Sequence, residues 1–168
     1  MSEFARELEK QLPKMRRYAL ALTRNRDRAD DLVQSTLVRA IAKQHLYKPG
    51  TNIRAWLFTL LHNQNVNDVR RSINQGISVE IEHVSKNLVS VADTSAPRQL
   101  KELDEAIGKL SIEQRQVLLM VGLEGMTYEE VATILMVPVG TVRSRLSRAR
   151  SALRQLMGMA EDQAAMAA

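Results

Sequence analysis

The chain has 168 residues, of which 45% are hydrophobic, and a formal net charge of +5, which fits one ordinary folded domain or two small ones. It contains no cysteine, and its three histidines lack the spacing of metal ligands, so we expect no disulfide, no metal site and no cofactor. No stretch approaches the roughly 18 consecutive apolar residues of a membrane span, and no secretion signal is recognisable. We therefore expect a cytoplasmic protein with no membrane insertion.

The charge is unevenly distributed along the chain. Residues 1–71 carry 14 Lys and Arg against 7 Asp and Glu, residues 72–100 carry 2 against 3, and residues 101–168 carry 8 against 9. A local excess of positive charge favours a polyanionic partner, because each neutralised phosphate releases counterions. A solvated basic surface explains the same excess equally well, so charge alone does not decide between the two.

Three helices are predicted in the N-terminal part of the chain from the spacing of apolar residues and from stop signals. They are expected over about Phe4–Thr23, Asp27–Gln44 and Ile53–Arg71. Asp27 has the character of a cap at the start of the second helix. The Pro49-Gly50 pair ends that helix, and Thr51 or Asn52 can cap the third.

Residues 72–97 sustain neither a helical nor a strand period and are rich in small and polar side chains. We therefore predict a flexible linker between two helical domains. The stretch SVEIEHV at residues 78–84 alternates briefly, so a short strand-like piece is possible there. A lone strand would, however, have no partner with which to pair.

Four further helices are predicted beyond the linker, and the last two are joined by a tight turn. The first three are expected over about Gln99–Lys109, Ile112–Gly122 and Tyr128–Leu135. Thr127 and Glu130 have the spacing of a capping box at the start of the third. Pro138 prevents this helix from continuing and suits the entry to the fourth, which begins near Val139. Two helices joined so tightly form a helix-turn-helix.

The fourth of these helices has one apolar stripe and one arginine-rich face. The stripe consists of Val142, Leu146, Ala149 and Leu153. At 100° per residue the opposite face carries Ser144, Ser147, Arg148 and Ser151, with Arg143, Arg150 and Arg154 on one flank and Arg145 on the other. Arginines reach guanine edges or phosphates, and short serines let the helix approach the bases. A solvated surface helix normally includes acids, and this one has none, so we favour DNA binding.

Several motifs are similar to those of the extracytoplasmic-function (ECF) sigma factors of bacterial RNA polymerase. Gly140-Thr-Val-Arg-Ser-Arg-Leu-Ser-Arg-Ala-Arg150 resembles their promoter-reading domain 4. Ala29-Asp-Asp-Leu-Val-Gln34 resembles their polymerase-clamp helix, and Asn52-Ile-Arg-Ala-Trp-Leu-Phe58 with Asp68-Val-Arg-Arg71 resembles their −10 reading helix. PGTNIRAWLFTLLHN and LLMVGLEGMTYEEVA are most similar to the general-stress subgroup of alphaproteobacteria.

The resemblance implies an all-α protein of two small helical domains. Sigma domain 2 would occupy residues 1–71, the linker 72–97, the helix-turn-helix domain 4 residues 98–160, and a C-terminal tail 161–168. Such a protein is not an enzyme. It binds core RNA polymerase, recognises the −35 and −10 elements of promoter DNA and promotes transcription initiation, here of stress-response genes. Family members are commonly held inactive by an anti-sigma factor, so such a partner is also implied.

The resemblance also assigns roles to individual residues. The −35 element would be read by Arg143, Ser144, Ser147 and Arg148, the −10 element by Tyr47, Asn63, Arg70 and Arg71, and the polymerase clamp would be contacted by Asp31 and Gln34. Structural explanations compete with these roles. Tyr47 can be an ordinary loop aromatic and Asn63 a solvated residue, whereas the acids near the start of a helix are favoured there by its dipole. We expect Trp56 to pack in the core rather than to meet DNA.

Three positions depart from the family pattern. Methionine stands at position 136, where the family usually has glycine, so the turn either strains Met136 or adopts another geometry. Ser35 and Leu37 stand where Glu and Phe are common, which can weaken the clamp contact. Two other function classes therefore stay open: a helix-turn-helix regulator that acts without polymerase, and a sigma-like decoy that titrates an inhibitor.

Overall fold

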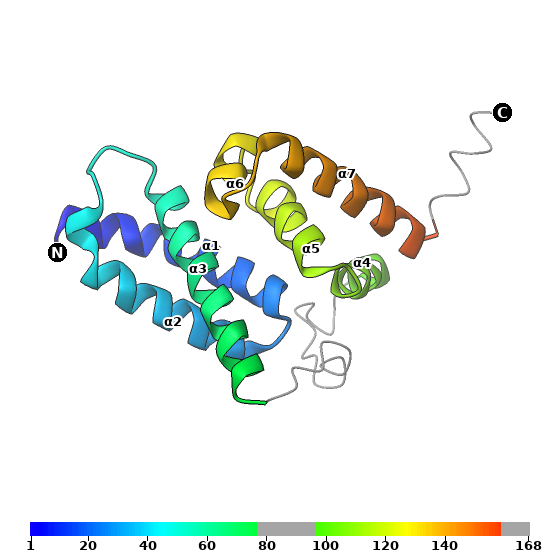
Figure 1. Ribbon diagram of the computed structural model, residues 1–168, viewed down its shortest axis with the longest axis horizontal. Helices are drawn as coiled ribbons and strands as arrows, with labels where there is room; N and C mark the ends of the chain where they lie inside the picture. Colours follow the sequence, from blue (N-terminus) through cyan, green and yellow to red (C-terminus); the bar gives the residue numbers. More distant parts are fainter. Residues whose placement is uncertain (77–96, 159–168) are drawn as a thin grey trace. The chain divides into compact units, whose positions relative to one another are not determined.

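The computed structural model describes residues 1–76 and 97–158, and all the regular secondary structure in these two ranges is helical (Figure 1). The chain divides into two compact units; of the described residues, the first contains 1–76 together with 133–136, and the second contains 97–132 and 137–158. The predicted all-α fold of two helical domains is thereby confirmed. The short strand considered at residues 78–84 and the tail at 161–168 lie outside the described residues.

Three long helices form the N-terminal unit. They are α1 (Glu3–Thr23), α2 (Arg26–Ala42) and α3 (Ile53–Asn74), and a short 3₁₀ turn, η1 (Gln44–Leu46), follows α2. Figure 1 shows α1 and α2 side by side, with α3 packed against α2. The predicted helices are all present, but α3 continues three residues beyond its predicted end at Arg71.

The start of each of these helices is fixed by a side chain that satisfies a free backbone N–H group. Ser2 accepts from the N–H of the fifth residue at 3.1 Å, and Asn52 caps α3 in the same way at 3.1 Å. The prediction of Asp27 as the cap of α2 is wrong. Asn25 has the extended backbone that a cap requires, and its side-chain oxygen accepts from the N–H of Arg28 at 3.0 Å. Asp27 lies in the first helical turn instead, where the helix dipole favours an acid.

The core of the N-terminal unit is built from the inward faces of the three helices. Tyr18 of α1 and Phe58 of α3 are both buried and meet edge to face, with ring centroids 5.1 Å apart. Aliphatic side chains surround them, namely Met15, Leu22, Leu32, Leu57 and Leu61. Such a core fixes how α2 and α3 present their outer faces, and those faces carry the predicted contact residues.

The C-terminal part of the chain contains shorter helices. They are α4 (Arg98–Gly108), α5 (Ile112–Leu118), a π-helical turn η3 (Leu119–Leu123), α6 (Tyr128–Leu135) and α7 (Val139–Leu156). Arg115 of α5 ties the end of α4 in place, because its guanidinium donates to the carbonyls of Ile107, Gly108 and Leu110 at 3.2, 2.8 and 3.1 Å. Carbonyls at a helix end lack intrahelical partners, and the guanidinium supplements the backbone N–H of Leu110, which donates to the Ile107 carbonyl at 3.2 Å.

The predicted single helix from Ile112 to Gly122 is interrupted. After Leu118 the backbone widens into the π-helical turn, in which the N–H of Glu124 donates to the carbonyl of Leu119 at 3.0 Å, five residues back. Sequence spacing did not reveal this change, because an apolar run such as Leu118–Met120 keeps apolar side chains on the inner face in either geometry.

The helix-turn-helix prediction is confirmed by its backbone contacts. Thr127 accepts from the N–H of Glu130 at 3.1 Å, as the capping box requires. At the other end of α6, the N–H of Val137 donates to the carbonyl of Ala132 at 3.1 Å, and Met136 has a left-handed backbone with φ of 55°. The turn is therefore a Schellman-type cap with methionine at the position that usually takes glycine. Of the two possibilities considered for Met136, the strained one is observed.

No helix in the described ranges is both long enough and apolar enough to cross a lipid bilayer.

Candidate nucleic-acid interface

Helix α7 presents the predicted arginine-rich face to solvent. Val142, Leu146 and Ala149 are buried, so the apolar stripe packs into the core and fixes the rotation of the helix. The exposed side chains are Arg143, Ser147, Arg148, Arg150, Ser151 and Arg154. Ser144 is half-buried and donates its hydroxyl to the carbonyl of Thr141 at 3.1 Å. Its oxygen therefore remains available as an acceptor.

Arg145 differs from the other arginines of α7. Its side chain is 22% exposed, and its guanidinium lies 3.7 Å from the carboxylate of Glu113 at the start of α5. This contact draws Arg145 toward the body of the unit and partly neutralises it. The remaining four arginines carry the free positive charge of the helix.

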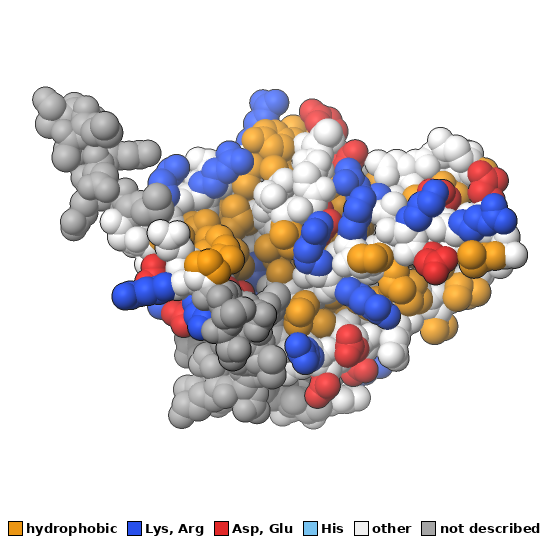
Figure 2. Space-filling model, turned by 180° about the vertical axis from the view of Figure 1, so that it is seen from behind, with side chains coloured by type: hydrophobic (Ala, Val, Ile, Leu, Met, Phe, Trp, Pro, Cys, Tyr) orange, Lys and Arg blue, Asp and Glu red, His pale blue; other side chains and the backbone are white. Residues whose placement is uncertain are grey.

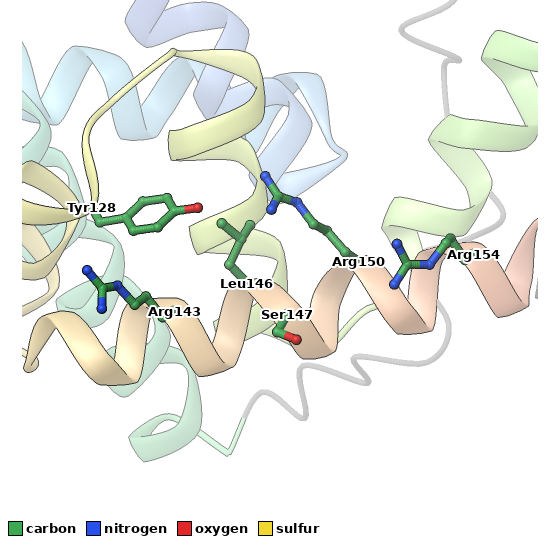
Figure 3. Close-up of a pocket in the computed structure, with 6 residues that line it drawn as sticks. All are labelled: Tyr128, Arg143, Leu146, Ser147, Arg150 and Arg154. Atoms are coloured by element: carbon green, nitrogen blue, oxygen red, sulfur yellow. The ribbon is translucent and has the colours of Figure 1, made fainter. Parts of the chain in front are cut away.

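A shallow groove runs along one flank of α7 (Figure 3). It is lined by Tyr128, Arg143, Leu146, Ser147, Arg150 and Arg154. In Figure 3 the Tyr128 ring extends from the start of α6 over Leu146, with its hydroxyl directed toward the Arg150 side. The glutamates that follow Tyr128 in the sequence do not line the groove, so its charge is entirely positive.

The face of the molecule in Figure 2 has a different character. Over that face Lys and Arg side chains are interspersed with Asp and Glu, and hydrophobic side chains reach the surface between them. Mixed charge of this kind is typical of an ordinary solvated surface. Among the helices of the described part of the chain, α7 has the largest number of arginines, and it contains no acidic residue.

The Tyr47 loop is a second candidate surface, and it lies in the N-terminal unit between η1 and α3. The Tyr47 ring packs against Phe4 of α1 and Trp56 of α3, with centroid distances of 5.8 and 5.4 Å. Its hydroxyl donates to the carbonyl of Thr51 at 3.0 Å, which closes the loop across Pro49. All three aromatic residues are half-buried. The expectation that Trp56 packs in the core is met only in part, because its side chain packs on Tyr47 and Phe4 but is half-buried and lies outside the buried core.

The other predicted −10 residues lie farther along α3. Asn63, Arg70 and Arg71 are exposed. Asn63 follows Trp56 by seven residues, so the two lie on one face of α3 about 10 Å apart along its axis. Tyr47 packs on Trp56 and so reaches the same face of α3 as Asn63. The two residues thus border one helix face from positions that are well separated along it.

Helix α2 presents Asp31 and Gln34 to solvent. The same face continues with two apolar residues that the sequence analysis did not assign, Val38 and Ile41, which are 68% and 55% exposed. The spacing of three, four and three residues along this face was the signal that could have revealed them. Large exposed side chains next to each other usually mark an interaction surface.

Two family models match the chain. Residues 8–62 match the Sigma2 domain of PhyR, and residues 100–153 match Sigma-70, region 4. Together with a helix-turn-helix whose second helix bears a free arginine face, they place the chain in the class of bacterial sigma factors. A relative from Rhodopseudomonas palustris, ECF RNA polymerase sigma factor EcfG, is 40% identical over 146 residues, which cover 87% of this chain and 80% of that one. The chain belongs to the ECF sigma factor family, which binds core RNA polymerase and initiates transcription at promoters.

Solved structures agree with this assignment. The sigma factor RpoE from Bartonella quintana, in complex with the anti-sigma factor NepR, matches with a TM-score of 0.83 and 33% identity over 95% of this chain and 99% of that one. CnrH in complex with the cytosolic domain of CnrY shares the fold, with a TM-score of 0.67 and 23% identity over 94% and 88% of the two chains. The predicted resemblance to ECF sigma factors is thereby confirmed.

Proposed function

We propose that this sigma factor directs RNA polymerase to the promoters of stress-response genes. In this proposal residues 1–71 form sigma domain 2, residues 72–97 the linker, residues 98–160 sigma domain 4, and 161–168 the tail. The likeness to EcfG and RpoE supports the general-stress subgroup. The observation that carries the proposal is the exposed, acid-free arginine face of α7 on a helix-turn-helix.

Duplex recognition at the −35 element is assigned to α7. Ser147 and Arg148 are exposed near the centre of its outer face, with Arg143 and Ser144 beside them. An arginine can donate two parallel hydrogen bonds to guanine, and the adjacent serines are short enough to let the helix approach the base edges. Domain 4 would thus read double-stranded DNA.

Single-strand recognition at the −10 element is assigned to the Tyr47 loop and the outer face of α3. Reading a base after the strands separate requires a stacking surface and a group that both donates and accepts hydrogen bonds. Tyr47 provides an aromatic ring held in place by two neighbours, and Asn63 provides the amide. Arg70 and Arg71 provide positive charge for the strand.

Core polymerase is proposed to bind the outer face of α2. Asp31 and Gln34 offer acceptors to a basic clamp, and Val38 and Ile41 add apolar area on the same side. We expect Asp31→Arg to weaken binding to core polymerase by about 1 kcal/mol or more, because it places like charges together. A titration of fluorescently labelled protein with core polymerase measures this, and an unaltered affinity with an intact fold would refute the assignment.

An anti-sigma factor is the proposed regulator. RpoE, which is 33% identical to this chain, was solved in complex with the anti-sigma factor NepR. An inhibitor of that kind would cover contact surfaces on both domains, including the Asp31 face of α2. A tagged copy purified from unstressed cells should therefore bring down a small stoichiometric protein. Recovery of polymerase alone would argue against such control.

We further propose that the protein acts in the cytoplasm, where its polymerase and promoters are, and that it catalyses no reaction itself. Transcription in vitro with core polymerase tests the whole proposal. We expect a transcript from a promoter with matching −35 and −10 elements, and none after both elements are scrambled. Sequence-specific binding as a dimer without polymerase would identify a helix-turn-helix regulator instead.

A decoy remains a second candidate function because residues 8–62 match the Sigma2 domain of PhyR. A chain in the complex of the anti-anti-sigma factor PhyR with the anti-sigma factor NepR from Bartonella quintana shares the fold alone, with a TM-score of 0.60 and 16% identity over 90% of this chain and 49% of that one. A decoy would bind an anti-sigma factor yet yield no transcript with core polymerase. The free arginine face of α7 favours the sigma factor, because a decoy has no need to read DNA.

A further inference from the structure

Half of the aromatic side chains of this protein gather at one place in the N-terminal unit. Phe4, Tyr47 and Trp56 are three of the six aromatic residues of the chain, and each of their rings contacts the other two. The ring centroids of Phe4 and Trp56 are 6.1 Å apart, and the other two pairs lie at 5.8 and 5.4 Å. All three side chains are half-buried, and none belongs to the core around Tyr18 and Phe58. Large side chains gathered at a surface usually mark an interaction site.

Phe4 comes from a different part of the chain than the other two rings. It lies in the first turn of α1, where the Ser2 hydroxyl accepts from the N–H of Ala5 and the Ser2 carbonyl accepts from the N–H of Arg6, both at 3.1 Å. The ends of helices open easily unless contacts elsewhere hold them. The contact of Phe4 with Tyr47 and Trp56 therefore joins the start of α1 to the loop.

The contact with Phe4 fixes a property of Tyr47 that its hydrogen bond cannot fix. The hydroxyl of Tyr47 donates to the carbonyl of Thr51 at 3.0 Å, which holds the far end of the side chain. The ring can still rotate about the axis from its β-carbon to that hydroxyl, because the terminal torsion of a tyrosine is broad. The rings of Phe4 and Trp56 limit this rotation, since both pack against Tyr47. They therefore set the plane of the Tyr47 ring.

We propose that Phe4 is a positioning residue for the capture of an unstacked −10 base. It acts through Tyr47, whose ring plane it sets, and does not itself touch DNA. A base stacks well only on a ring that faces it, and a ring already held in that plane loses less entropy when the base binds. The inference rests on the proposed −10 recognition by Tyr47 and Asn63. It makes the first turn of α1 a part of the −10 site.

The first test uses full-length protein assembled with core polymerase and measures its affinity for a fluorescently labelled single-stranded −10 oligonucleotide. We expect Phe4→Ala to lower this affinity about threefold to tenfold, the change expected for the loss of one or two aromatic contacts. Phe4→Leu should recover part of the affinity, because it restores volume without a ring. Leu20→Ala is the matched control: it removes a half-buried side chain from the same helix, about 24 Å farther along its axis. It should lower stability but not the affinity, and neither change should alter −35 duplex binding.

A second measurement follows the cluster itself. Trp56 is the only tryptophan of the chain, so the tryptophan fluorescence of the free full-length protein reports on these three rings. Phe4→Ala should shift the emission to longer wavelength and increase quenching by acrylamide, because the indole gains contact with water. Leu20→Ala should change neither. An emission spectrum that Phe4→Ala leaves unaltered would show that the ring contact does not form in solution, and would overturn the proposal.

Two further comparisons separate positioning from a general effect on the fold. In a Tyr47→Ala background, Phe4→Ala should cause no additional loss of single-strand affinity, because the ring through which it acts is gone. Oligonucleotides that lack one base at successive positions are then compared with the complete strand. At one position the loss caused by Phe4→Ala should disappear. Additive losses, or a loss that persists at every position, would mean that Phe4 contacts DNA itself or acts only through stability, and the proposal would be wrong.

The same variants distinguish a failure of this inference from a failure of the proposed −10 recognition. If Tyr47→Ala and Asn63→Ala both leave the single-strand affinity unaltered, the −10 proposal falls and the role of Phe4 falls with it. If Tyr47→Ala weakens binding while Phe4→Ala does not, the −10 proposal stands and only the positioning role of Phe4 is refuted.

Discussion

The α7 face and the Tyr47 loop differ in how their contact residues are held. On α7 the positions are fixed by the buried stripe behind them, and four of the five arginines project freely into solvent. In the loop, by contrast, Tyr47 is held by its own contacts, with two tilted aromatic rings next to it and the Thr51 carbonyl at its hydroxyl. The α7 face consists of long side chains on a rigid helix. The loop, in contrast, carries a fixed aromatic ring on an irregular backbone.

The difference matches what each surface is proposed to bind. Base edges in a duplex lie at fixed positions in a groove, so long side chains can adjust to them. A base that has left the stack is mobile, and a preorganised ring reduces the entropy lost on its capture. If this comparison is right, substitution of a supporting residue that does not touch DNA should weaken DNA binding by the loop but not DNA binding by α7.

The largest effect is expected in the loop. Tyr47→Ala should lower the affinity for single-stranded −10 DNA by about 1–3 kcal/mol, the scale of base stacking, and leave −35 duplex binding unaltered. Phe4→Ala, which removes only a supporting ring, should cause a smaller loss of the same kind. Fluorescence titration with −10 oligonucleotides measures both, and a full loss from Tyr47→Ala with no effect of Phe4→Ala would contradict preorganisation.

The two −10 residues can also be tested together. If Tyr47 and Asn63 contact the same base, the losses from Tyr47→Ala and Asn63→Ala should be less than additive. Open-complex formation is then compared on a normal promoter and on one already mismatched at the −10 element. A capture site shows its defect on both templates, whereas complete rescue by the mismatch would indicate a role in strand separation.

On α7, Arg148→Ala should reduce the affinity for the consensus −35 duplex by about 2 kcal/mol, within the 1–3 range of a bidentate base contact. Specificity at one base pair should be relaxed. Competition binding with single-base variants of the −35 element measures this preference. Equal loss on every variant would instead identify Arg148 as a contact of the DNA backbone.

A smaller effect is expected at the turn before α7. Met136 is 85% exposed and has a left-handed backbone, which costs a non-glycine residue about 1–2 kcal/mol. Met136→Gly should therefore raise the free energy of unfolding by about 0.5–1 kcal/mol, after the greater flexibility of glycine in the unfolded chain is subtracted. Urea denaturation of the full chain tests this, with Met136→Ala as the control that should give no gain.

The smallest effect concerns pH. Burial lowers the pKa of His62 on α3 below the ordinary value of a histidine. The unfolded chain then binds more protons than the folded one near that pH, so stability should fall as the pH decreases below about 6.5. The described part of the C-terminal unit contains no histidine. Denaturation at about pH 7.5 and about pH 5.5 should show a small loss in the wild type that His62→Gln removes; an unaltered loss would exclude His62.

The same contrast explains which features the sequence predicted. The 3.6-residue period and the capping signals placed α6 at Tyr128–Leu135 and the start of α7 at Val139, both as observed. They also identified the arginine face, because a regular helix converts spacing directly into direction. The domain class and the family resemblance followed from the same motifs.

Features that depend on contacts between distant residues were missed. The packing of Phe4 on Tyr47 joins the start of α1 to a loop more than forty residues later, and no local period encodes such a contact. The cap at Asn25 was missed because Asp27 two residues on is an equally good capping side chain, and only the backbone decided between them. Residue type alone does not distinguish the exposed apolar Val38 and Ile41 from core residues; only their spacing from Asp31 and Gln34 could have revealed them.

The π-helical turn at Leu119–Leu123 has a consequence for how the length of this protein can change over generations. A π turn holds one residue more than the α turn it replaces, so it is the form in which a helix absorbs a one-residue insertion. Loss of a residue there, at exposed Gly122 for example, can be accommodated by closing the turn into regular α-helix. The same loss near Thr141 in α7 would turn every later arginine by about 100° away from its present direction. The chain can thus tolerate the loss of one residue just before the helix-turn-helix, but not the loss of one residue within its second helix.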